Sequence, residues 1–103
     1  MNINPFDLIK NAQKIQSQMS SFQAKLETIK TTGSSGGGLV EIDMNGKLEV
    51  YAVRIAKEAM DGGDTELLED LVLSAFTDSM AKIKEKISLE VGAMSGGIPG
   101  FPA

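Results

Sequence analysis

The stretch LVEIDM at residues 39–44, followed directly by Asn45-Gly46, decides the fold of this chain. Apolar and acidic residues alternate along it, which places Val40, Ile42 and Met44 on one face of a β-strand. Asn-Gly is the strongest short signal for a two-residue hairpin turn. The stretch therefore predicts a strand that buries one face and then turns back into another strand.

Residues 47–56 continue in β-type residues, but their apolar positions are even before Tyr51 and odd after it. The apolar residues concerned are Leu48, Val50, Val53 and Ile55. A slip of one residue turns every following side chain to the other face of a sheet. We therefore expect a bulge or break near Tyr51, which gives two strands here and three in all.

A long helix is predicted over residues 5–31, ahead of the strands. Asn4 is a favourable cap, and Pro5 suits a first helical position because its missing N–H has no partner there. Apolar residues recur at alternating steps of four and three, as in a heptad repeat: Leu8, Ala12, Ile15, Met19, Phe22, Leu26 and Ile29. About 27 residues make a rod of roughly 40 Å. One small sheet cannot cover such a rod, so part of this seam should meet another helix.

The remaining segments complete an α+β chain. The glycine-rich residues 33–38 predict a flexible turn, and residues 58–64 an acidic loop. A second long helix should begin near Asp64 or Thr65, both good capping residues. We expect a single domain over residues 1–93 and a disordered Gly/Pro-rich tail over 94–103.

The composition argues against catalysis and metal binding. The chain has no cysteine and no histidine, which removes thiolate chemistry, structural zinc sites and the commonest general base. No spaced acidic loop of the EF-hand type is present. No apolar run approaches the roughly 18 residues that span a bilayer, and no secretory signal is visible. We expect a cytoplasmic protein that is not an enzyme, with no cofactor, no metal, no small-molecule substrate and no membrane contact.

The net charge of −4 argues against attraction of the whole surface to a polyanion. The negative charge is local, however, because six of the fourteen acidic residues crowd one loop and helix start: Glu58, Asp61, Asp64, Glu66, Glu69 and Asp70. On the first helix, Lys10, Lys14 and Lys25 lie within roughly one quadrant of a helical wheel, opposite the apolar seam. Lys30 follows at its end. These residues suit contacts with a phosphate backbone, although on the residues alone an ordinary solvated face explains the stripe better.

A second group of lysines lies in the second helix. Lys82 and Lys86 are one turn apart and share a face, and Lys82 can pair with Asp78. Surface ion pairing explains this group at least as well as ligand binding does.

Several motifs occur together in a family-specific order. A glycine-rich turn runs into GLV at residues 38–40, Asn45-Gly46 follows, and LEDLV at residues 68–72 precedes Ala75-Phe76-Thr77-Asp78. The sequence IKNAQKIQ at residues 9–16 and the Gly-Pro-rich end also fit. In these features the chain resembles the YbaB/EbfC family of nucleoid-associated proteins over nearly its whole length. It departs from the family at Ala56-Lys57, where Asp-Pro is usual, and in the looser loop after it.

The resemblance implies an α-β-β-β-α subunit with a long N-terminal helix, a three-stranded antiparallel sheet and a long C-terminal helix. It further implies a tweezer-like homodimer that binds double-stranded DNA with little sequence preference, at the nucleoid. Lys10 and Lys14 match basic positions of the family's first-helix motif, and Lys82 matches a commonly basic position. Lys25 and Lys30 are candidates from the helical wheel only.

Two functions follow as hypotheses. In the first, the chain is a DNA-binding homodimer that organises the nucleoid and can affect gene regulation. In the second, it is a protein–protein interaction or chaperone-like protein whose helical arms hold a polypeptide through the apolar seam. Co-purification of nucleic acid that salt removes would distinguish them.

Overall fold

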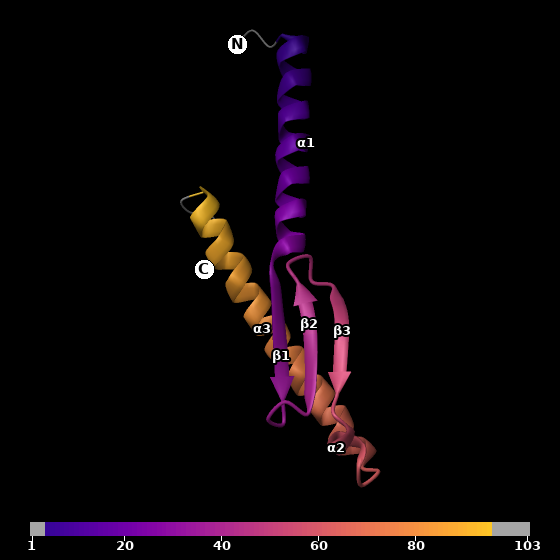
Figure 1. Cartoon of the computed structure of the whole chain (residues 1–103). Coiled ribbons are helices and arrows are strands. Elements are labelled where there is room, and N and C mark those ends of the chain that lie inside the picture. Colours follow the sequence, from indigo (N-terminus) through magenta and orange to yellow (C-terminus); the bar gives the residue numbers. More distant parts are fainter. Residues whose placement is uncertain (1–3, 96–103) are drawn as a thin grey trace.

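The protein consists of a three-stranded sheet with one long helix, α3, packed against it and another, α1, projecting beyond it (Figure 1). The computed structural model describes residues 4–95. Its elements are α1 (Pro5–Thr28), β1 (Lys30–Ser35), β2 (Val40–Asn45), β3 (Val50–Ile55), α2 (Lys57–Met60) and α3 (Thr65–Ser95). The α-β-β-β-α order confirms the expected fold class, with the short α2 as an addition.

The sheet is antiparallel with strand order β1-β2-β3. Asp43 pairs with Ala52, whereas Met44 pairs with Val50, so Tyr51 is the extra residue of a bulge. The bulge predicted near Tyr51 is therefore confirmed. It does not divide the segment into two strands, because β3 continues through it.

The first strand lies where the sequence predicted a helix end and a flexible turn, so that prediction was wrong. The helix α1 ends at Thr28, and β1 contains Thr31, Thr32 and Gly33. The two threonines are β-branched and favour extended backbone. Gly33 is buried beneath α3, where a β-carbon would collide with the backbone of Ser79 and Ala75. Glycine in this strand thus serves close packing of a helix rather than flexibility.

The turn between β2 and β3 is longer than the predicted two residues. The Asn45 N–H donates to the Glu49 carbonyl at 3.0 Å, and the Leu48 N–H donates to the Asn45 carbonyl at 3.0 Å. Leu48, not Gly46, has a positive φ of 63°. Residues with a side chain rarely adopt this left-handed backbone conformation, so glycine would be the expected residue at position 48.

Gly46 instead attaches α1 to the sheet. Its N–H donates to the carbonyls of Leu26 at 3.0 Å and Ile29 at 2.9 Å. A β-carbon at Gly46 would lie 2.5 Å from the Leu26 carbonyl oxygen, so only glycine allows this approach. The end of α1 is therefore held directly on the turn.

The core lies between α3 and one face of the sheet. One cluster of buried residues contains Ile29, Met44 and Ile83, with Leu26 packed against it. The other contains Val40, Ile42 and Ala75. The alternation predicted for residues 39–44 is confirmed, because Val40, Ile42 and Met44 are all buried.

The helix α3 begins at Thr65 as predicted, and the Asp64 carboxylate caps it by accepting from the Leu67 N–H at 3.1 Å. The predicted loop over residues 58–64 is partly helical, because α2 occupies Lys57–Met60. Of the predicted tail, residues 96–103 lie outside the described residues.

The first helix projects beyond the sheet as an arm (Figure 1). None of its residues is buried, and the molecule extends 72 Å along its longest axis but only 22 Å and 19 Å along the others. Only the end of the seam, at Leu26 and Ile29, reaches the core cluster that includes Ile83 of α3. Phe22 is half-buried, and the seam from Leu8 to Met19 is open to solvent.

Candidate nucleic-acid interface

The tip of the α1 arm carries two lysines that have no partner among the described residues. The helix starts at a well-formed cap, where the Asn4 carboxamide oxygen accepts from the Phe6 N–H at 2.9 Å. Lys10 and Lys14 follow one turn apart, and both are exposed. Within residues 4–95, neither side chain takes part in an ion pair or hydrogen bond. Both ammonium groups are therefore available to an anionic ligand.

The other two candidates near the arm are engaged. Lys25 pairs with Glu90 of α3, with 3.7 Å between Nζ and Oε2. The Lys30 ammonium lies 5.5 Å from the centre of the Tyr51 ring, across the face of the sheet. Cation–π contacts and exposed ion pairs of this kind are worth only about 1 kcal/mol. A polyanion could therefore recruit both lysines at a small cost.

Lys82 belongs to a different part of the molecule. Its ammonium lies 2.9 Å from Asp78 Oδ2 and donates to the Thr32 carbonyl at 3.3 Å. The hydrogen bond from Lys82, together with one from the Ser34 N–H, holds the pKa of Asp78 below its ordinary value. The structure therefore places Lys82 at the edge of β1, away from Lys10 and Lys14 on the arm.

Lys86 occupies an equivalent position one turn later, where it donates to the Lys30 carbonyl at 2.9 Å. Its shared helix face with Lys82 was visible in the sequence. Its hydrogen-bond partner, the Lys30 carbonyl, is not evident from the sequence, because the sequence predicts a helix end and a turn over the residues that form β1.

The only arginine of the chain is held by carboxylates. Arg54 donates to Asp43 at 2.7 Å and 2.8 Å, and to Glu41 at 3.3 Å. The pKa of Asp43 is lowered by the Arg54 hydrogen bonds and by one from Thr32. Arginine is the commonest reader of guanine edges, so its commitment to the sheet removes that means of base recognition.

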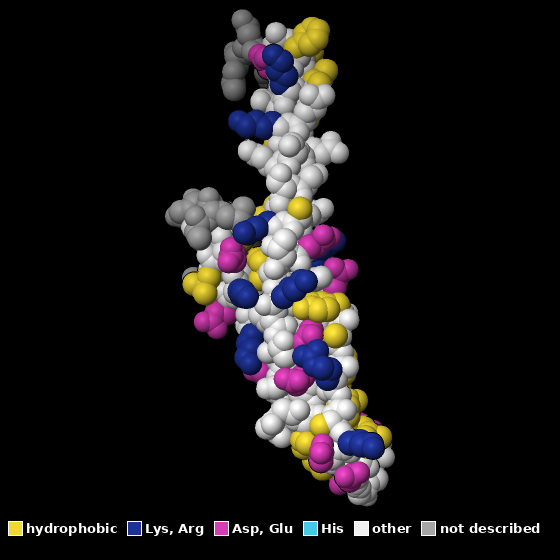
Figure 2. All heavy atoms as spheres, in the orientation of Figure 1, with side chains coloured by type: hydrophobic (Ala, Val, Ile, Leu, Met, Phe, Trp, Pro, Cys, Tyr) yellow, Lys and Arg dark blue, Asp and Glu magenta, His cyan; other side chains and the backbone are white. Residues whose placement is uncertain are grey.

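The charged groups are unevenly distributed along the molecule. Figure 2 shows basic side chains with one acidic side chain on the upper part of the arm, and basic and acidic side chains intermixed over the rest of the molecule. The six acidic residues named above are all exposed, and they lie in α2, the following loop and the start of α3. The negative net charge thus lies mainly away from the arm.

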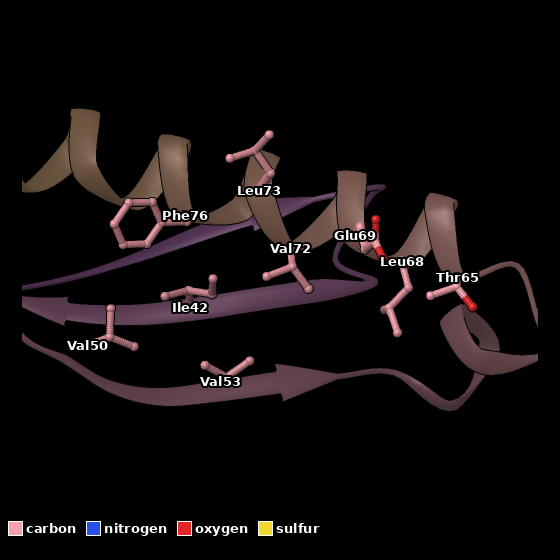
Figure 3. A pocket seen from close by; sticks show the side chains of 9 residues that line it. All are labelled: Ile42, Val50, Val53, Thr65, Leu68, Glu69, Val72, Leu73 and Phe76. Carbon is pink, nitrogen blue, oxygen red and sulfur yellow. The ribbon is translucent and has the colours of Figure 1, made fainter.

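An apolar groove of about 600 Å³ opens between β3 and α3 (Figure 3). It exists because α3 lies close to β1, at Gly33, and leaves the inner face of β3 uncovered. Its lining residues are Ile42, Val50, Val53, Thr65, Leu68, Glu69, Val72, Leu73 and Phe76. Val53 is 50% exposed and Leu73 64% exposed. Contiguous apolar surface that stays open to solvent is a common feature of interaction sites.

Comparison with protein families places the sequence in a known group. The model of the YbaB/EbfC DNA-binding family matches residues 1–98. The chain belongs to this family. The resemblance indicated by the sequence motifs is thereby confirmed. Membership of a DNA-binding family whose members are named nucleoid-associated proteins argues against an enzyme.

Several YbaB/EbfC relatives are named nucleoid-associated proteins. One from Paramagnetospirillum magneticum is 42% identical over 98 residues, which cover 92% of each chain. One from Clostridium acetobutylicum is 40% identical over 100 residues, which cover 95% of this chain and 89% of the relative. One from Dictyoglomus thermophilum is 36% identical over 96 residues, covering 93% and 92% respectively. These names support nucleoid-associated DNA binding and a nucleoid location.

A solved structure shares the fold. The crystal structure of an uncharacterized protein from Helicobacter pylori matches with a TM-score of 0.71 and 22% sequence identity. The match covers 90% of this chain and 98% of that one. At this identity the likeness concerns the fold alone.

Two further features are absent from residues 4–95. No group of three or more acidic, cysteine or histidine side chains is arranged there to hold a metal ion. No helix in that range is long and apolar enough to cross a membrane.

Proposed function

We propose that the chain binds double-stranded DNA as a homodimer with low sequence specificity, and so contributes to nucleoid organisation and to gene regulation. The observation that carries this proposal is the projecting α1 arm, on which Lys10 and Lys14 are exposed and have no partner within residues 4–95. Lysines held away from the acidic end can reach phosphates even though the whole chain is negative.

The apolar groove between β3 and α3 supports the dimer. Leaving Leu73 and Val53 in water is unfavourable, and burial of apolar area is the main driving force of association. A second copy brings an identical groove, so a two-fold axis there would cover both grooves at once. It would also provide two arms, and hence four unpaired arm lysines for one duplex.

Low sequence specificity follows from the types of side chain on the arm. Phosphate contacts fix the position of a protein on DNA but carry no sequence information. Lysine ammonium groups make such contacts, and the only arginine is held by Asp43 and Glu41. We expect DNA duplexes of equal length but different base sequence to bind with similar affinity.

The proposal is tested by fluorescence anisotropy with duplex DNA over a series of salt concentrations. Lys10→Ala/Lys14→Ala should reduce the slope of log K against log salt by about 3 to 4, because each phosphate contact contributes about 0.9 and a dimer loses four. Lys57→Ala/Lys84→Ala is the matched control, since it removes the same charge from exposed positions outside the arm. Equal slopes for the two double variants would contradict the proposed DNA face.

The second candidate function is binding of a polypeptide by the arm. It is favoured by the open seam, where Ile15 is 57% and Met19 is 59% exposed, and by a shallow groove alongside them that polar residues also line. If this function is the correct one, protein purified at low salt will carry no nucleic acid, and Met19→Asp will abolish capture of its partner. Nucleic acid that co-purifies at low salt and leaves at high salt would favour DNA binding instead.

A further inference from the structure

The two edges of the sheet differ in how their backbone groups are covered. In strand order β1-β2-β3, the edges are β1 and β3. Alternate residues of an edge strand direct their N–H and C=O groups away from the neighbouring strand, where they can pair with another chain. On β1 these residues are Lys30, Thr32 and Ser34, as their hydrogen bonds to α3 show.

Three side chains of α3 cover this edge in register. The Ser34 N–H donates to Asp78 at 2.9 Å, Lys82 donates to the Thr32 carbonyl at 3.3 Å, and Lys86 donates to the Lys30 carbonyl at 2.9 Å. We call Asp78, Lys82 and Lys86 the edge ladder. One outward backbone group of each strand residue is thus covered: an acceptor meets the Ser34 N–H, and donors meet the Thr32 and Lys30 carbonyls.

The register follows from helix and strand geometry. Four residues of a helix rise about 6.0 Å, and two residues of a strand about 6.7 Å. The helix α3 runs antiparallel to β1, so steps of four along α3 meet steps of two along β1. Gly33 allows the close approach that this requires, because its missing side chain leaves room for the α3 backbone at Ser79.

The edge of β3 carries no such cover. Within residues 4–95, no side chain donates to or accepts from the outward backbone groups of β3. The groove beside it is apolar and open. Of the two edges, only β3 is therefore available to another chain.

We propose that the edge ladder closes β1 to sheet pairing, so that a second copy of this chain associates only on the β3 side and the assembly stops at a dimer. This inference rests on the proposed homodimer. If both edges were open, two-fold contacts at β3 and at β1 would alternate, and the sheets would extend without limit instead of closing. The ladder therefore determines the size of the particle, and Lys82 acts in assembly rather than as a DNA contact.

The test removes the ladder from the full chain with Asp78→Ala/Lys82→Ala/Lys86→Ala. Light scattering coupled to size exclusion should show wild type at the mass of two chains and the variant at masses that grow with concentration, with added intermolecular β-sheet in the infrared spectrum. The matched control Lys57→Ala/Lys84→Ala/Glu85→Ala removes two lysines and one acidic residue from exposed positions and should stay at two chains. A folded ladder variant that stays at two chains at every concentration would overturn the proposal.

A second variant separates the ladder from the dimer interface. Adding Leu73→Asp/Phe76→Asp, which places charges in the apolar groove, should limit the ladder variant to pairs joined through β1. If wild type itself is a monomer, the proposed dimer fails, and the ladder variant must then gain pairs through β1 for this inference to stand.

Should the triple variant not fold, single substitutions measured by amide hydrogen exchange take its place. In Asp78→Ala, the Ser34 amide should exchange at least tenfold faster while the amide of Gly33, on the β2 side of the strand, is unchanged. Unchanged protection at Ser34 would overturn the proposal, because the ladder would then not cover the edge in solution.

Discussion

The lysines of the two long helices differ in their surroundings. On α3, Lys82 and Lys86 are bonded to carbonyls of β1, whereas on α1, Lys10 and Lys14 are exposed and have no partner in the described chain. The difference follows from packing. The helix α3 lies on the sheet and buries Ala75, Ser79 and Ile83, whereas α1 buries none of its residues. A cation is available for a ligand where its helix leaves the body of the protein.

The largest expected contrast between the helices is in stability. Ile83 on α3 is fully buried, so Ile83→Ala should reduce the free energy of unfolding by about 2–5 kcal/mol through lost burial and a cavity. Ile15 on α1 is 57% exposed, so Ile15→Ala should change it by less than about 0.5 kcal/mol. Urea denaturation of both variants measures this contrast. An equal loss for Ile15→Ala would mean that another chain covers the arm in solution.

A smaller effect is expected at the junction between the helices. Glu90→Gln breaks the ion pair to Lys25 and should release that lysine for phosphate contact. Because an exposed pair of this kind is worth about 0.2–1 kcal/mol, DNA affinity per chain should rise by a factor of about 1.4 to 5 at low salt. Glu85→Gln removes the same charge from α3 without touching Lys25, and it serves as the control. Equal affinities for the two variants would place Lys25 outside the DNA face.

The smallest effect concerns the titration of Asp78. Its pKa lies below the ordinary 3.8, first because of the Lys82 hydrogen bond and then because of the Ser34 N–H. A lowered pKa means that the contact stabilises the fold above about pH 4 and that this contribution is lost as the pH falls through the lowered value. Carboxyl carbon NMR should show Asp78 titrating below 3.8, and in Lys82→Met its pKa should rise. An unchanged pKa in Lys82→Met would show that the two side chains do not meet in solution.

The helices and the central strand could be predicted because their signals are local. Asn4-Pro5 marks the start of α1, Asp64 caps α3, and the alternation over residues 39–44 gives the buried face of β2. The change from even to odd apolar positions at Tyr51 likewise predicts the bulge. In each case neighbouring residues along the chain determine the structure.

The first strand and its edge could not be predicted for the opposite reason. Gly33 reads as part of a flexible turn, and its actual role depends on Ser79, which is distant in sequence. Because the sequence does not predict β1, it shows no backbone partner for Lys82 or Lys86. Lys82 is therefore a candidate DNA contact on the sequence alone. The exposure of Lys10 and Lys14, in contrast, followed from the helical wheel, because the face opposite the seam is solvated whether or not the seam is covered.

The central claim is that DNA meets the lysines of α1 and not those of α3, and NMR of the lysine side chains during titration with a short duplex tests it most directly. Signals of Lys10 and Lys14 should shift in proportion to bound DNA and return when salt is raised, while those of Lys82 and Lys86 stay in place. Shifts confined to Lys82 and Lys86, with the arm lysines unmoved, would contradict the account.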